Sequence, residues 1–89
     1  MVQARLLISG IVQGVGYRYS CRRQGQGLGL TGWVRNLPDG RVEAVVQGPQ
    51  KQVDELIRWC YRGPEEARVS DIQVTFETPS VSFPDFGIR

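Results

Sequence analysis

The sequence contains no histidine, only two cysteines, and a single lysine, Lys51, among its 11 basic residues. Without histidine, a catalytic triad built on that residue is excluded, and the usual ligand sets of zinc lack a member. Cys21 and Cys60 form neither a metal-binding motif nor a disulfide framework. In a reducing cytoplasm we expect both as buried free thiols, although their spacing does not determine whether they lie close enough to pair. We therefore expect no metal and no other cofactor.

Long apolar stretches are also absent. No segment approaches the roughly 18 apolar residues of a membrane-spanning helix, and no basic region followed by an apolar run opens the chain. We therefore expect a cytoplasmic protein with no membrane segment. A chain of 89 residues can bury one core, which predicts a single domain over residues 1–89. No sequence feature demands a protein partner, so we expect a monomer.

The basic residues are almost all arginine, although the net charge is only +2. So small a charge does not indicate binding to nucleic acid or to a membrane surface. The planar guanidinium fork of arginine suits phosphate and carboxylate groups. The base composition of a genome would produce the same bias, so both explanations stay open.

Hydrophobic periodicity and turn signals predict an α+β fold. Strands are expected over residues 4–11, 31–37, 41–47 and 69–77, with a short last strand over 86–88, and helices over 17–28 and between Pro49 and Gly63. The order β-α-β-β-α-β predicts a ferredoxin-like sandwich, in which two helices cover one face of an antiparallel sheet. A short C-terminal strand completes this sheet.

The first expected helix is weakened by Gly25 and Gly27. Each glycine costs roughly 1 kcal/mol relative to alanine in a helix interior. We therefore expect this helix to fray at its C-terminal end. The same argument predicts that Gly25→Ala stabilises the protein by up to roughly 1 kcal/mol.

The segment "SGIVQGVGYRYS", residues 9–20, runs from a strand through glycines into a helix. Such a bend exposes backbone N–H groups at the positive end of the helix dipole, where anions bind. Arg18 lies in the first helical turn, where a cation costs a few tenths to about 1 kcal/mol unless an anion offsets the repulsion. Alternatively, Gly14 and Gly16 only permit a tight turn, and Arg18 points into solvent.

Two separated blocks and the order of elements together resemble one family. "GIVQGVGYR", then "LGLTGWVRNLPDGRVEAVVQG", an amphipathic helix and "GPEEARVSDI" look like an acylphosphatase over nearly the whole chain. The resemblance implies a hydrolase that cleaves the carboxyl-phosphate bond of small acyl phosphates. Its products are a carboxylate and inorganic phosphate, and it uses no metal.

The resemblance also implies the site residues. Arg18 corresponds to the phosphate-binding arginine of the family, and Asn36 to the asparagine that positions the attacking water. The phosphate cradle falls on five consecutive residues, Gln13, Gly14, Val15, Gly16 and Tyr17. A carboxylate leaving group, with a conjugate acid of pKa about 4, needs no general acid. An amide cannot act as a base at neutral pH, so in this family the phosphate itself takes the proton.

Other interpretations of these residues stay open. Asn36 lies just before the turn "LPDG" and would there hydrogen-bond the hairpin backbone. A non-enzymatic anion-binding or regulatory domain of the same fold also fits the sequence. An RNA-binding domain fits less well, because "ARLLISG" and "RVEAVVQG" contain no aromatic residue. We expect Trp33 and Tyr17 in the core or at its rim, and Arg35 and Arg41 in solvent.

Overall fold

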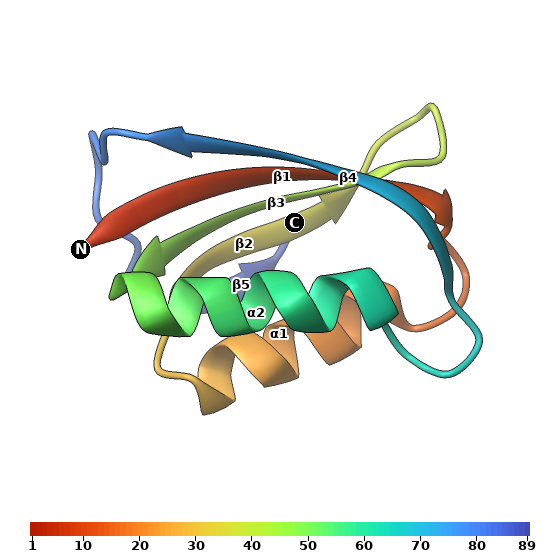
Figure 1. The fold of residues 1–89 in the computed structure, drawn as a ribbon, viewed down its shortest axis with the longest axis horizontal. Helices are drawn as coiled ribbons and strands as arrows, with labels where there is room; N and C mark the ends of the chain where they lie inside the picture. The colour runs from red at the N-terminus through yellow and green to blue at the C-terminus, as the bar shows by residue number, and fades with distance from the viewer.

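The computed structural model describes residues 1–89 as a sheet of five strands with two helices against one face (Figure 1). The elements are β1 (Val2–Ile11), α1 (Tyr17–Gly27), β2 (Thr31–Asn36), β3 (Val42–Gly48), α2 (Gln50–Arg62), β4 (Arg68–Glu77) and β5 (Phe86–Ile88). Their order in the sheet is β4-β1-β3-β2-β5. This arrangement confirms the predicted ferredoxin-like fold. No helix is both long and apolar enough to cross a membrane.

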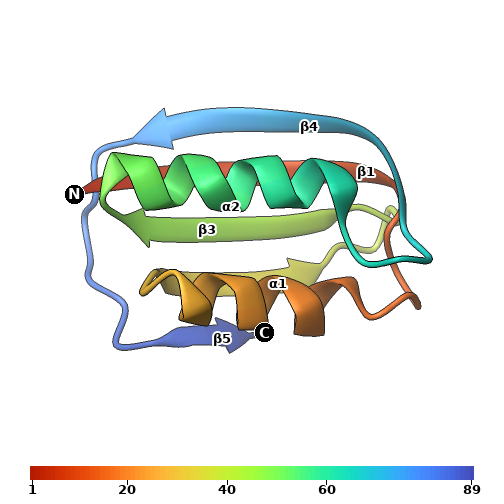
Figure 2. The same ribbon diagram turned by 60° about the horizontal axis from the view of Figure 1, so that its bottom comes forward.

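The last strand differs from the other four in direction. β1 pairs antiparallel with β3 and β4, and β2 pairs antiparallel with β3. β5 instead pairs parallel with β2, with Phe86 opposite Gly32. The loop of residues 78–85 crosses the end of the sheet, so β5 starts at the same end as β2 (Figure 2). The sheet is therefore antiparallel except at this edge.

The core lies between the sheet and the helices. Ala4, Leu6 and Ile8 alternate along β1 and are fully buried on the side that faces the helices. The spacing of Val53, Leu56, Ile57 and Cys60 predicts a buried stripe on α2, and the structure buries all of these except Ile57, which is half-buried. Burying each large apolar side chain contributes about 1.5–3 kcal/mol, so this layer holds the helices to the sheet.

Gly25 of α1 packs against β5 rather than weakening the helix. A Cβ atom at this position would lie 2.6 Å from two ring atoms of Phe86. The structure argues against the predicted stabilisation by Gly25→Ala, because the buried Phe86 ring occupies the space that a methyl group needs. The end of α1 is also anchored by the N–H of Leu30, which donates to Gly25 O at 2.9 Å.

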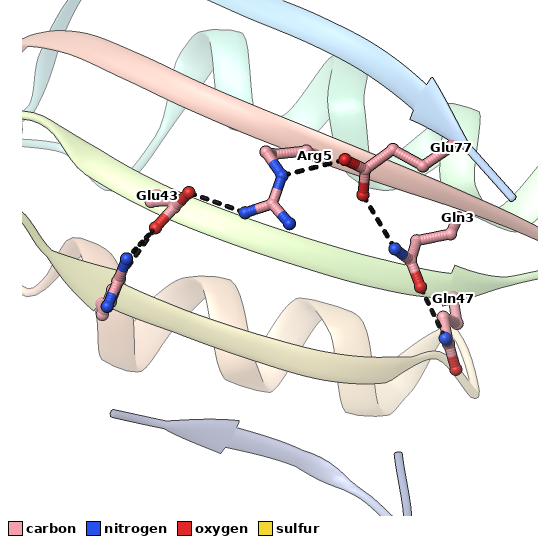
Figure 3. Close-up of polar contacts among 6 residues, drawn as sticks. Gln3, Arg5, Glu43, Gln47 and Glu77 are labelled. Carbon is pink, nitrogen blue, oxygen red and sulfur yellow. Dashed lines mark hydrogen bonds and ion pairs between the residues drawn. The ribbon is translucent and has the colours of Figure 1, made fainter. Parts of the chain in front are cut away.

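The other face of the sheet carries a polar network instead of helices (Figure 3). Arg5 of β1 forms ion pairs with Glu43 of β3 and with Glu77 of β4, at 2.8 and 3.1 Å. Arg35 of β2 pairs with the second carboxylate oxygen of Glu43 at 2.7 Å. Trp33 lies beside this network and is only 8% exposed. Arg35 is exposed, as the sequence predicted, and its ion pair with Glu43 also joins two neighbouring strands.

Candidate active site

The loop between β1 and α1 has the backbone conformation of an anion cradle. Gly14 and Gly16 have φ angles of 76° and 78°, in the left-handed region that other residues rarely adopt. No atom lies within 4 Å of a Cβ built on either glycine, so the requirement is conformational rather than steric. Where left-handed residues alternate with right-handed ones, successive backbone N–H groups point toward one concave side, where an anion can bind.

These N–H groups have no acceptor within the protein backbone. Gln13, Gly14, Val15 and Gly16 donate no backbone hydrogen bond to another backbone group. Gly16 is the N-cap of α1, and neither a capping side chain nor an acidic residue occupies the first turn. The positive end of the helix dipole and the loop donors are thus available to an anion. A plain turn would not require so many free donors in one place.

Arg18 and Asn36 line a common pocket with this loop. The pocket has a volume of about 180 Å³ and is lined by Val12, Gly14, Gly16, Tyr17, Arg18, Tyr19, Asn36 and Ile88. The fold brings Asn36, at the end of β2, to the start of α1. Arg18 is half-buried and does not take part in the ion pairs of the protein. The guanidinium is therefore free for a ligand in the pocket.

The amide oxygen of Asn36 is the buried polar side-chain atom without a hydrogen-bond partner. Leaving such an atom unpaired costs about 1–3 kcal/mol, which a bound molecule with a donor group would recover. The hairpin does not use this amide. It is Gln13 that donates from Nε2 to Leu37 O and Arg41 O, at 2.8 and 2.9 Å.

The side chain of Gln13 therefore has a structural role that the sequence did not indicate. It ties the loop before α1 to both ends of the turn after β2, and so holds the loop beside Asn36. No local pattern could predict this contact, because its partners lie 24 and 28 residues away and are backbone carbonyls. Only the backbone of Gln13 was expected in the site.

Tyr17 belongs to the predicted cradle through its backbone alone. Its hydroxyl donates to Cys60 O of α2 at 2.6 Å, and its ring packs against Trp59 with centroids 5.6 Å apart. Burial raises the pKa of the Tyr17 phenol, so this group stays protonated. Cys21 and Cys60 are buried free thiols, and the interaction with the Cys60 thiol, together with burial, raises the pKa of Cys21.

The structure contains no cluster of three or more histidine, cysteine, aspartate or glutamate side chains that could hold a metal ion. The chemistry available in the pocket is that of one guanidinium, several backbone donors and one amide oxygen. Such a set binds a tetrahedral anion and orients a small polar molecule beside it.

Comparisons with known proteins indicate the same family over nearly the whole chain. The acylphosphatase family model matches residues 4–88. The acylphosphatase of Anaeromyxobacter dehalogenans is 50% identical over 88 residues, which cover 99% of this chain and 95% of that protein. The acylphosphatase of Aeropyrum pernix is 51% identical over 90 residues, covering 100% and 89%.

Solved structures lead to the same family. The crystal structure of acylphosphatase from Bacillus subtilis superposes with a TM-score of 0.97 at 35% identity, and covers 100% of this chain and 99% of that one. These relatives favour the enzyme over the non-enzymatic domain that the sequence had left open. The chain belongs to the acylphosphatase family and is a hydrolase that converts an acyl phosphate to a carboxylate and phosphate.

Proposed function

We propose that Arg18 and the backbone of residues 13–17 bind the phosphoryl group, and that Asn36 positions the attacking water. The observation that carries this proposal is the unpaired, buried Oδ1 of Asn36, which lines the same pocket as Arg18. This oxygen can accept a hydrogen bond from a water and so direct the water's lone pair toward phosphorus. The guanidinium offers two parallel donors to the phosphoryl oxygens.

The reaction then needs little further help from side chains. The water oxygen bonds to phosphorus while the bond from phosphorus to the carboxylate oxygen breaks. One water proton passes to a phosphoryl oxygen, because the Asn36 amide cannot accept it at neutral pH. The carboxylate departs without a general acid, since its conjugate acid has a pKa of about 4. Charge on the phosphoryl oxygens is stabilised by Arg18 and the loop donors.

The acyl group of the substrate lies, in this proposal, at the rim formed by Tyr19 and Ile88. These side chains are 53% and 37% exposed and give the mouth of the pocket an apolar edge. A volume of about 180 Å³ accommodates a phosphoryl group with a short attachment. We therefore propose small carboxyl phosphates as substrates.

We further propose that the chain acts as a single-domain monomer in the cytoplasm. One continuous cluster of 17 buried residues forms the core, which supports a single domain. The buried free thiols Cys21 and Cys60 suit a reducing compartment. The nearly buried Trp33 on the sheet face offers little ring surface for stacking on bases, which argues against nucleic acid as a partner.

The test compares Arg18→Ala with Asn36→Ala in acyl phosphate hydrolysis, with a strong chelator present in every assay. Arg18→Ala should abolish turnover and weaken the binding of inorganic phosphate, since the guanidinium holds the anion throughout. Asn36→Ala should lower turnover by about 10²-fold or more, because the water loses its orientation, while phosphate affinity stays near the wild-type value.

Melting temperatures of the same samples provide the control. If Asn36 only supported the hairpin, Asn36→Ala would lower stability by about 1 kcal/mol and leave turnover intact. Near-normal turnover of a folded Asn36→Ala variant would remove Asn36 from the mechanism. Loss of wild-type activity in chelator, with recovery on adding a divalent cation, would overturn the metal-free reaction.

A further inference from the structure

The largest groove of the molecule lies outside the pocket of Arg18 and Asn36. It has a volume of about 580 Å³ and forms where α1, the end of α2 and the start of β4 meet. The start of α1 and the end of α2 lie at the same end of the molecule (Figure 2). Ten residues line it, Ser20, Arg23, Gln24, Trp59, Arg62, Gly63, Pro64, Glu65, Ala67 and Arg68. The groove shares no lining residue with the catalytic pocket.

Three arginines from different segments surround this groove. Arg23 comes from α1, Arg62 from the last turn of α2, and Arg68 from the start of β4. All three are exposed, and none takes part in the four ion pairs of the protein. One carboxylate, Glu65, is present in the lining. Unneutralised like charges on facing walls repel one another, and an anion between them removes this repulsion.

Local backbone electrostatics account for part of this arrangement. Arg62 lies near the C-terminal carbonyls of α2, where the helix dipole favours a cation. Arg68 donates from one guanidinium nitrogen to Glu65 O and Ala67 O. Arg23 lies in the middle of α1, and its guanidinium carbon is 5.9 Å from the centre of the Tyr19 ring. None of these contacts neutralises the three positive charges with a carboxylate, so an anion in the groove would still be attracted to all three arginines.

The rest of the lining indicates the kind of ligand. Only two of the ten lining residues are hydrophobic, which disfavours an apolar molecule. One of the two is Trp59, whose half-buried indole packs against the ring of Tyr17 and provides a flat wall. The volume lies in the range of small-molecule sites, about 300–1,000 Å³. Guanidinium groups on separate walls can bind more than one phosphate group at once.

We propose that this groove, which we call the helix groove, binds a small ligand that carries several phosphate groups. Arg23, Arg62 and Arg68 donate to the phosphate oxygens. Both inorganic polyphosphate and a nucleoside polyphosphate supply this chemistry. The two differ at Trp59, on whose flat face the base of a nucleotide can stack. The site is independent of the reaction at Arg18.

The test is a calorimetric titration with tripolyphosphate at an ionic strength of about 0.15 M, where weak surface attraction is screened. The protein is the full chain with Arg18→Ala, so that binding in the catalytic pocket is weakened, and the groove variants below identify the binding that belongs to the groove. We expect saturable binding of one tripolyphosphate per chain. Adding Arg23→Gln or Arg62→Gln should lower the affinity at least about tenfold, because each removes a charged donor.

The matched control is Lys51→Gln, which removes the same charge from the exposed first turn of α2, outside the groove. It should change the affinity less than about twofold. Equal losses of tripolyphosphate affinity in the control and in the groove variants would overturn the proposal, and so would the absence of saturable binding. So would inorganic phosphate binding as tightly as tripolyphosphate.

A second titration with adenosine triphosphate distinguishes the two sources of the ligand. Tighter binding than tripolyphosphate, lost in Trp59→Leu, supports a nucleoside polyphosphate that stacks on the indole. Equal affinity supports recognition of the phosphate chain alone. Circular dichroism checks the folding of every variant. The exposed arginine and lysine variants should stay within about 0.5 kcal/mol of the parent in stability, whereas Trp59→Leu changes a half-buried side chain that packs against Tyr17, so its melting temperature is measured as well.

Discussion

Gln13 shows how a single side chain can align two parts of a site that are distant in the sequence. Its backbone belongs to the loop that we propose as the phosphate cradle, while its amide nitrogen binds the carbonyls of Leu37 and Arg41. Asn36 immediately precedes one of these carbonyls. In the proposed site, the spacing between the phosphate loop and Asn36 therefore depends on hydrogen bonds made by a residue that need not touch the water.

We predict that Gln13→Ala lowers turnover about 10-fold to 10²-fold, because small displacements of catalytic groups are costly. The loss should appear mainly in kcat, with a smaller change in KM, since the backbone donors of the loop remain. Stability should fall by about 1–2 kcal/mol for the two lost hydrogen bonds. Steady-state kinetics and urea unfolding measure these effects.

Gln26→Ala is the matched control for this variant. Gln26 Nε2 also donates to a backbone carbonyl, that of Phe86, but does not line the catalytic pocket. Its loss should reduce stability slightly and leave kcat unchanged. Wild-type kcat in Gln13→Ala would show that the loop keeps its position without this side chain.

At the scale of elements, α1 depends on β5 for its packing. Gly25 is buried beneath the Phe86 ring, and Gly27 lies two residues further along the helix with no atom near its side-chain position. The two glycines look equivalent in the sequence because helix propensity depends on residue type alone. Their surroundings differ, because only Gly25 has a neighbouring atom in the space that a Cβ atom would fill. We therefore expect alanine to have opposite effects on stability at the two positions.

We predict that Gly27→Ala stabilises the protein by up to about 1 kcal/mol, because alanine loses less backbone entropy on folding. Gly25→Ala should destabilise it by about 1–3 kcal/mol, because the Phe86 ring must move out of a packed core. Urea unfolding of both variants tests the pair. Stabilisation by Gly25→Ala would mean that β5 yields easily and contributes little to holding α1.

At the scale of the whole molecule, the two faces of the sheet are stabilised by different interactions. Apolar burial joins one face to the helices, whereas ion pairs and amide hydrogen bonds link the strands across the other (Figure 3). Burial alone would raise the pKa of Glu43, but hydrogen bonds from Arg35 and Arg5 outweigh it and hold the pKa below its usual value. Hydrogen bonds from Gln3 and Arg5 lower the pKa of Glu77.

These lowered pKa values predict how stability depends on pH. Protons bind more readily to the unfolded chain, so the stabilisation is complete above the ordinary glutamate pKa of about 4.3 and is lost as the pH falls through the folded-state values. Unfolding free energies should therefore decline below about pH 4.5. Urea titrations between pH 7 and pH 3 measure this decline.

Glu43→Gln should be less stable than the wild type at pH 7 and show a shallower decline in acid. Glu66→Gln, which removes an exposed carboxylate with no ion pair, is the control and should follow the wild-type curve. If the unfolding free energy of Glu43→Gln declined in acid as steeply as that of the wild type, the decline would be due to other carboxylates.

Much of the fold could be predicted because its signals are local. The run of apolar, branched residues in β1, the spacing of Val53, Leu56 and Cys60, and the turn between β2 and β3 are each signals from residues close in sequence. The direction of β5 could not be predicted in this way. It depends on where the loop of residues 78–85 leads the chain, which no pattern within the last strand determines.

The sequence by itself determined the element order, the glycine loop and the presence of Arg18 in the first turn of α1, because backbone preferences and hydrophobic periods act over a few residues. Only the tertiary structure decided that Asn36 Oδ1 has no partner, that Gln13 reaches the hairpin, and that Phe86 covers Gly25. These contacts join residues far apart in the chain, so they exist only after packing has set the distances between elements. The same holds for the helix groove, whose arginines come from three separate elements.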